Sequence, residues 1–121
     1  MAIKIKTKNG EINIENDVIA SIVGGAAIAN PGVVGMASRA ALRDGMDQIL
    51  NRETYGRGVV VHQKDIGLSV DVYVVAQYGM RLAEISKSVQ KKVKYNLDAQ
   101  LGVRAAEVNI IIQGIQTGDY R

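Results

Sequence analysis

The sequence predicts an α+β fold, in which a mixed β-sheet with an N-terminal hairpin is packed by two main helices and a shorter middle helix. Residues 3–14 and 68–77 alternate in the way that is typical of strands with one buried face, and the apolar run that opens 59–63 is also expected to form a strand. Longer stretches at 16–30 and 81–101 repeat apolar residues at helical spacing. With 121 residues and a hydrophobic fraction of 47%, the chain has the size and apolar content of a single domain, 1–121.

The first expected element is a hairpin over residues 3–14. Ile3, Ile5 and Thr7 alternate with lysines as far as Lys8, isoleucines alternate with polar residues from Glu11, and Asn9-Gly10 stands between the two runs. Asn-Gly between alternating runs is the strongest short-range signal of a β-hairpin.

A helix is expected over residues 16–30, with Glu15 or Asn16 as its N-cap and Pro31-Gly32 as its end. Apolar residues surround this helix almost completely: Val18, Ile19, Ile22, Val23, Ala26 and Ile28. Such a helix is either buried in its own domain or covered by a second copy of the chain. The sequence therefore allows a homo-oligomer, and we expect Ile22→Asp to unfold the domain or to break an oligomer.

The variable middle, residues 32–57, has the weakest patterns. A short strand is predicted at 32–36 and a second helix at 39–52, and Gly56-Arg57-Gly58 is a flexible joint between this segment and the next unit.

A strand-strand-helix-strand unit is expected over residues 58–114, followed by a short tail at 115–121. Strands at 59–63 and 68–77 are joined by a tight turn, the helix at 81–101 ends at Gly102, and a last strand covers 107–113. A strand-helix-strand crossover places its two strands parallel, so the sheet is predicted to be mixed.

Composition excludes several classes of site. The chain has no cysteine, hence no disulfide framework, thiolate nucleophile or cysteine metal site. Its longest apolar run, Val18–Ala29, is shorter than the roughly 20 residues of a membrane span, and no export signal is visible. These features indicate a cytoplasmic protein without a transmembrane segment.

No residue is predicted to be catalytic, to bind a metal or to bind a cofactor. His62 is the only histidine, and we interpret it as a solvated residue of a strand. Asp44 and Asp47 share one helix face, where exposed charge is the simpler explanation than a divalent-cation or acid–base pair. We therefore predict that the chain is not an enzyme.

Nucleic-acid binding is the alternative function. Gly32-Val33-Val34-Gly35 is a G-x-x-G segment between two predicted helices, an order similar to that of the KH module. However, valines replace the usual basic residues between the glycines, and no aromatic platform is visible for base stacking. The net charge of +3 is the only other support, so nucleic acid is disfavoured as a partner.

A basic patch is predicted on the helix at 81–101. Lys87, Lys91 and Lys94 fall at i, i+4 and i+7, and Lys92 is adjacent. These four lysines are our candidate partner-binding residues, and a merely solvated helix face is the alternative explanation.

Four segments resemble the alkaline shock protein family, also called the Gls general-stress or envelope stress response family, of Gram-positive bacteria. They are Val18–Gly24 with Pro31–Met36, Asp44-Gly45 before Gly58–Val61, Leu68–Val75 with Tyr78-Gly79, and Val108–Ile115. The resemblance covers about residues 10–115 and is to the short, single-domain, YloU-like kind.

The resemblance implies a non-enzymatic cytoplasmic interaction or scaffold protein of the envelope stress response or of fatty-acid and lipid homeostasis. It implies a protein partner, either a membrane anchor protein or an enzyme of fatty-acid metabolism. Contact with the membrane would then be peripheral and would pass through that partner. It implies no cofactor and no catalytic residue.

Overall fold

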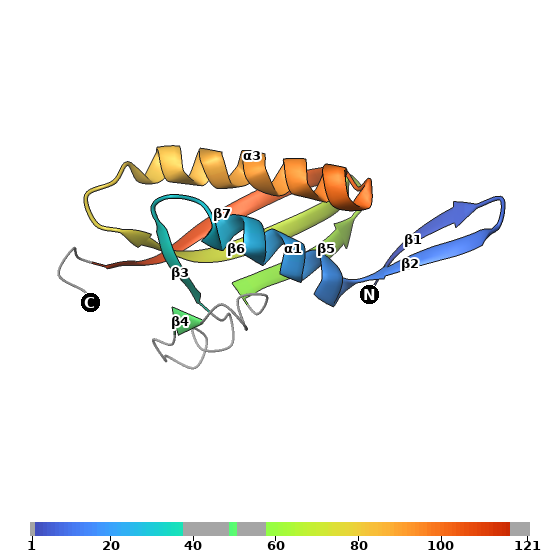
Figure 1. Cartoon of the computed structure of the whole chain (residues 1–121), viewed down its shortest axis with the longest axis horizontal. Coiled ribbons are helices and arrows are strands. Elements are labelled where there is room, and N and C mark those ends of the chain that lie inside the picture. Colours follow the sequence, from blue (N-terminus) through green and yellow to red (C-terminus); the bar gives the residue numbers. More distant parts are fainter. Residues whose placement is uncertain (1, 38–48, 51–57, 117–121) are drawn as a thin grey trace.

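The computed structural model describes residues 2–37, 49–50 and 58–116. The elements follow one another as β1 (Ala2–Thr7), β2 (Gly10–Glu15), α1 (Asn16–Ile28), β3 (Val33–Ala37), β4 (Ile49–Leu50), β5 (Val59–Lys64), β6 (Gly67–Gln77), α3 (Leu82–Leu101) and β7 (Ala105–Gln116). Figure 1 shows a sheet with its helices on one side and a separate hairpin that projects from the body. The predicted α+β class is confirmed.

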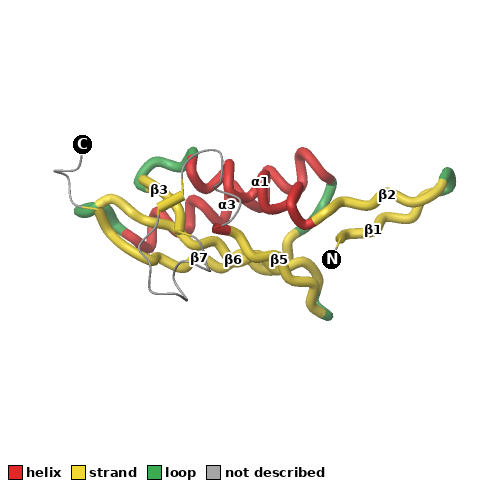
Figure 2. The backbone as a smooth tube through the Cα atoms, turned by 90° about the horizontal axis from the view of Figure 1, so that it is seen from below, coloured by secondary structure: helices red, strands yellow, loops and turns green. Residues whose placement is uncertain are grey.

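β6 is the central strand of the main sheet. On one side it pairs in parallel with β7 along residues 68–77. On its other side it pairs antiparallel with β5 through residues 67–72 and with β3 through residues 74–76, while β4 pairs with β3. The sheet is therefore mixed, as the crossover predicted, and Figure 2 shows β7, β6 and β5 side by side.

The two helices cover one face of this sheet. Alternate residues of β6 point toward them and are buried: Leu68, Val70, Val72, Val74 and Ala76. From the helices, Ile19 and Val23 of α1 and the seam Ile85, Val89, Val93 and Leu97 of α3 join the same core. Because the apolar period is two along β6 and helical along α3, each element turns an apolar side toward this core. The opposite side of β6 carries the polar Ser69 and Asp71, and Ser69 and Val75 are buried there as well.

A buried asparagine joins the end of α1 to α3. Asn30 is only 2% exposed, and its Oδ1 accepts a 2.7 Å hydrogen bond from the hydroxyl of Ser88. Its Nδ2 donates to the Pro31 carbonyl at 2.8 Å, so both ends of the amide are satisfied. This bridge fixes the position of α1 along α3.

The N-terminal hairpin is confirmed, although its turn lies one residue earlier than expected. Thr7 pairs with Gly10, so the two-residue loop is Lys8-Asn9, and Gly10, with φ of 142°, already belongs to β2. Both cross-strand isoleucine pairs, Ile3 with Ile14 and Ile5 with Ile12, lie on one face of the hairpin.

Two predicted boundaries are corrected. α1 ends at Ile28 and not at about Asn30, because the Asn30 N–H bonds the Ala27 carbonyl in a tighter turn that leads into Pro31. β7 runs to Gln116, beyond the predicted 107–113, because β6 continues to pair with it as far as Gln77.

The predicted middle helix at 39–52 is wrong at its C-terminal end. Ile49 and Leu50 form strand β4, which pairs with Ala37 and Met36 of β3. These two apolar residues lie near the end of a helical pattern, but a short apolar run is compatible with either a helix or a strand. The pattern alone therefore could not show that they pair with β3. The rest of this predicted helix lies outside the described residues.

Candidate functional site

The predicted lysine patch lies on the outward side of α3. Lys87, Lys91 and Lys94 are exposed, whereas the seam residues Val89 and Val93 are fully buried. The three lysines line one open groove of about 460 Å³ together with Glu84, Ser88, Gln90 and Val108. The groove thus joins one side of α3 to strand β7.

Lys92 does not share this surface. It is exposed, but it does not line the groove. One residue advances about 100° around an α-helix, so Lys92 leaves α3 in a different direction from Lys91. The structure therefore brings together three of the four predicted residues.

Gln90 connects the lysine-bearing helix to the edge of the sheet. Its Nε2 donates a 2.8 Å hydrogen bond to the backbone carbonyl of Val108 on β7. Residues three and four apart are neighbours on a helix, so Lys87 and Lys94 stand next to Gln90, one turn before it and one turn after it, between the outward side of α3 and β7. The acceptor of this bond is a backbone atom, so no pattern of side chains in the sequence could have predicted it.

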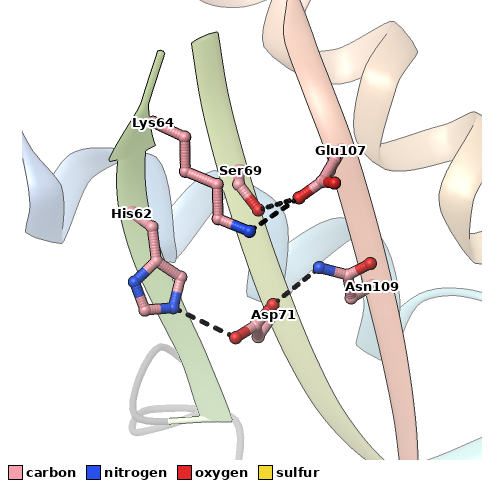
Figure 3. Close-up of polar contacts among 6 residues, drawn as sticks. All are labelled: His62, Lys64, Ser69, Asp71, Glu107 and Asn109. Atoms are coloured by element: carbon pink, nitrogen blue, oxygen red, sulfur yellow. Dashed lines mark hydrogen bonds and ion pairs between the residues drawn. The ribbon is translucent and has the colours of Figure 1, made fainter. Parts of the chain in front are cut away.

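A network of polar side chains occupies the sheet face opposite the helices (Figure 3). The Glu107 Oε1 accepts hydrogen bonds from Lys64 Nζ at 3.0 Å and from the Ser69 hydroxyl at 2.9 Å. Next to it, Asp71 accepts from His62 Nε2 at 3.1 Å and from Asn109 Nδ2 at 2.9 Å. Three neighbouring strands, β5, β6 and β7, each contribute to this network.

The network does not assemble a nucleophile. His62 and Asp71 form a base and its orienting carboxylate, but the Ser69 hydroxyl donates to Glu107 and not to His62. Ser69 is also fully buried, so a substrate would not reach it without a rearrangement. We interpret the six side chains as cross-strand bonds that fix the register of β5, β6 and β7.

The hydrogen bonds of this network act on the ionisation of Glu107. Its hydrogen bond from Lys64 holds its pKa below the ordinary value of 4.5, and the Ser69 hydroxyl lowers the pKa further. Both donors stabilise the carboxylate over the protonated acid.

Substituting Lys64 by Met is expected to raise the pKa of Glu107 toward 4.5, because the largest cause of its depression is removed. Carboxyl-detected NMR titration measures this pKa directly. In the wild type, the stabilisation by Glu107 is complete above the pKa of the unfolded chain and is lost as the pH falls through the lower folded pKa. Glu107→Gln should therefore destabilise the protein at neutral pH and lose this effect in acid; an equal loss of stability at both pH values would contradict the assignment.

The remaining candidates from the sequence do not gather at a site. Asp44 and Asp47 lie outside the described residues. Val33, Val34 and Gly35 belong to strand β3, where Val33 pairs with Ala76 and is buried. In the part of the chain that the structure describes, no group of three or more His, Asp or Glu residues could hold a metal ion.

The contact between His62 and Asp71 could have been predicted from the sequence, whereas the contacts of Glu107 with Lys64 and Ser69 could not. A tight turn between the strands at 59–63 and 68–77 fixes their antiparallel register, which places His62 opposite Ser69 and diagonal to Asp71. By contrast, the helical crossover before β7 allows several parallel registers. Glu107 and Asn109 could therefore not be assigned to their partners in advance.

Comparison with known proteins gives the family. Residues 4–117 match the alkaline shock protein 23 family, which is described as having a cell envelope-related function. The chain belongs to this family. The resemblance seen in the sequence is thereby confirmed.

Relatives within this alkaline shock family cover nearly the whole chain. The uncharacterized protein Spy1614 of Streptococcus pyogenes is 49% identical over 96% of this chain and 96% of its own length. The uncharacterized protein YloU of Bacillus subtilis is 41% identical over 96% of this chain and 97% of its own, and YqhY of the same organism is 33% identical over 91% and 80%. No solved structure matches the chain.

No helix among the described residues is both long enough and apolar enough to cross a membrane.

Proposed function

We propose that this alkaline shock family protein is a non-enzymatic, cytoplasmic interaction protein of the cell-envelope stress response or of lipid homeostasis. Its α3 surface, defined by Lys87, Lys91 and Lys94, binds an acidic partner protein. The proposal rests on one observation: three exposed lysine side chains lie on one helix, line one groove and form no ion pair within the described residues. Cations without internal partners are free to pair with an external carboxylate.

The cell envelope-related description of the family supports the cellular setting of this proposal. A membrane anchor protein and an enzyme of fatty-acid metabolism are the two kinds of partner that we expect, and contact with the membrane would pass through such a partner. The polar network on the opposite sheet face supports a non-catalytic role, because the Ser69 hydroxyl bonds Glu107 whereas His62 bonds Asp71.

A KH-like nucleic-acid interface is the second candidate. It needs an exposed loop at the G-x-x-G segment to hold a nucleotide backbone. Strand β3 begins within this segment instead, at Val33, and pairs Val33 and Gly35 with β6. The acidic-protein proposal is therefore preferred.

Reversing Lys87, Lys91 and Lys94 to Glu is expected to abolish partner binding without unfolding the chain. Each reversal changes the charge by two, so the formal net charge goes from +3 to −3. Exposed substitutions usually cost less than about 0.5 kcal/mol each, so the melting temperature should change little. Affinity purification from cells that produce the protein, with quantitative mass spectrometry, measures the partners that are kept and lost.

The hairpin supplies a matched control. Lys4, Lys6 and Lys8 are also exposed, and reversing them gives the same net charge from a different surface. Wild-type protein and the hairpin variant should recover the same partners, less so as salt is raised, while the α3 variant should not. Equal recovery by all three proteins would show that the α3 lysines serve only solubility.

A further inference from the structure

Strand β7 is an edge strand beside the lysine-lined groove. At Val108 this edge is covered, because the Gln90 amide bonds the carbonyl and the residue is only 5% exposed; the free part of the edge lies beyond Val108. Among the residues that the structure describes, β7 pairs only with β6, although it is 12 residues long. An edge strand presents unpaired backbone N–H and C=O groups, to which another extended chain can bind.

The backbone of β7 shows which groups face this edge. Lys64 and Gly67 flank a two-residue turn, and such a pair exchanges backbone hydrogen bonds. Every second residue of β6 from Gly67 therefore directs its backbone groups to β5, and the residues between, including Val70, direct theirs to β7. Val70 lies opposite Val108, whose own groups then point away from β6, in agreement with the Gln90 bond to its carbonyl. By alternation, the N–H and C=O of Ile110 and Ile112, which lie opposite Val72 and Val74, point outward as well.

The side of α3 beside this edge is mainly basic: three lysines and one acidic residue, Glu84, line the groove. Gln90 contacts Val108, and Lys87 and Lys94 stand on either side of Gln90. Lys87 and Lys94 are seven residues apart, which corresponds to about 10 Å along the helix axis. Side chains on one face of an extended strand recur every second residue, so they are separated by about 7 or 13 Å. An extended chain that lies along β7 with an acidic residue at every second position can therefore meet both lysines.

We propose that the groove between α3 and β7 takes up an extended, acidic segment of the partner protein as an additional strand on β7. The backbone groups at Ile110 and Ile112 supply the strand pairing, and Lys87 and Lys94 select acidic side chains. Strand addition of this kind combines affinity from the backbone with specificity from alternate side chains. This inference rests on the proposed function and specifies its partner.

A second copy of this chain fits the same edge poorly. Pairing two β7 edges would bring the Lys87 and Lys94 side chains of both copies toward the shared edge, where like charges repel. An acidic segment neutralises these charges instead. Charge complementarity therefore favours a foreign acidic chain over self-association.

The test uses a fluorescein-labelled peptide of eight residues in which Glu and Thr alternate. Fluorescence anisotropy measures its binding to the full chain at low salt, and amide hydrogen exchange reports on β7. We expect saturable binding and slower exchange at Ile110 and Ile112. The double variant Lys87→Glu/Lys94→Glu should weaken binding by about tenfold or more, while Lys4→Glu/Lys6→Glu, with the same charge change, should stay within about twofold.

A second peptide separates strand addition from simple charge attraction. It has the same sequence but is N-methylated at its four central amides, so it keeps its carboxylates and loses backbone donors. We expect it to bind about tenfold more weakly than the parent peptide. If it binds equally well, the strand-addition inference is overturned while the α3 surface remains a binding site for acidic chains. If neither peptide responds to the α3 variant, the proposed function fails too.

The other occupants are tested in the same way. Anionic vesicles, a single-stranded RNA and the chain itself at high concentration are examined by sedimentation and by hydrogen exchange. Protection of Ile110 and Ile112 by any of these, without protection by the acidic peptide, overturns the inference.

Discussion

Replacing Val23 by Asp is expected to prevent folding. Val23 is fully buried in the core between α1 and the sheet, where a carboxylate would have no partner. An unpaired buried charge costs several kcal/mol, against a total stability of about 5–15 kcal/mol for a domain. Circular dichroism and thermal unfolding measure the loss. The substitution predicted from the sequence, Ile22→Asp, is a weaker test because Ile22 is only half-buried.

Val18→Asp is the matched control on the same helix. Val18 is 45% exposed and lies near the N-terminus of α1, where a negative charge interacts favourably with the helix dipole. This variant should fold with a melting temperature close to that of the wild type. If it instead halves the mass in solution, α1 is covered by a second copy, as one of the two sequence interpretations allowed. If Val23→Asp leaves the melting temperature unchanged, the packing of α1 described above is wrong.

The predictable parts of this fold are those whose signals are local. Alternation along residues 68–77 identified β6 and its buried face, and the i, i+4 spacing of Lys87 and Lys91 placed them on the outside of α3. Gly102, with φ of 68°, ends α3 as the sequence indicated. In each case neighbouring residues determine the structure, so a pattern in the chain is sufficient.

The parts that could not be predicted depend on long-range pairing. Ile49 and Leu50 read as the end of a helix because their partners in β3 are not visible in the local pattern. The groove arises for the same reason, since Gln90 and Val108 meet only through the crossover from α3 to β7. The lysines of the candidate site were identifiable from spacing, whereas the sheet edge beside them required the structure.

Replacing Gly32 by Ala is expected to destabilise the chain by roughly 2–4 kcal/mol. Gly32 has φ of 94°, a conformation that L side chains rarely adopt, and its carbonyl accepts a 2.9 Å bond from the N–H of Gln77. A Cβ at this position would lie 2.7 Å from Cδ1 of Ile85. Ile85 is 4% exposed, so little free space is available for it to move. Urea unfolding at neutral pH measures the change.

Gly79 provides the control that separates backbone strain from packing. Its φ of 90° is nearly the same, but a Cβ there meets no atom within 4 Å, so Gly79→Ala should cost only about 1–2 kcal/mol. Ile85→Val removes the Cδ1 atom that lies nearest to the new Cβ. In a double-mutant cycle it should therefore cost less in the Gly32→Ala background than in the wild type. Equal losses for the two glycine variants, together with additivity in the cycle, would show that strain alone acts at Gly32 and that contact between this loop and α3 contributes nothing.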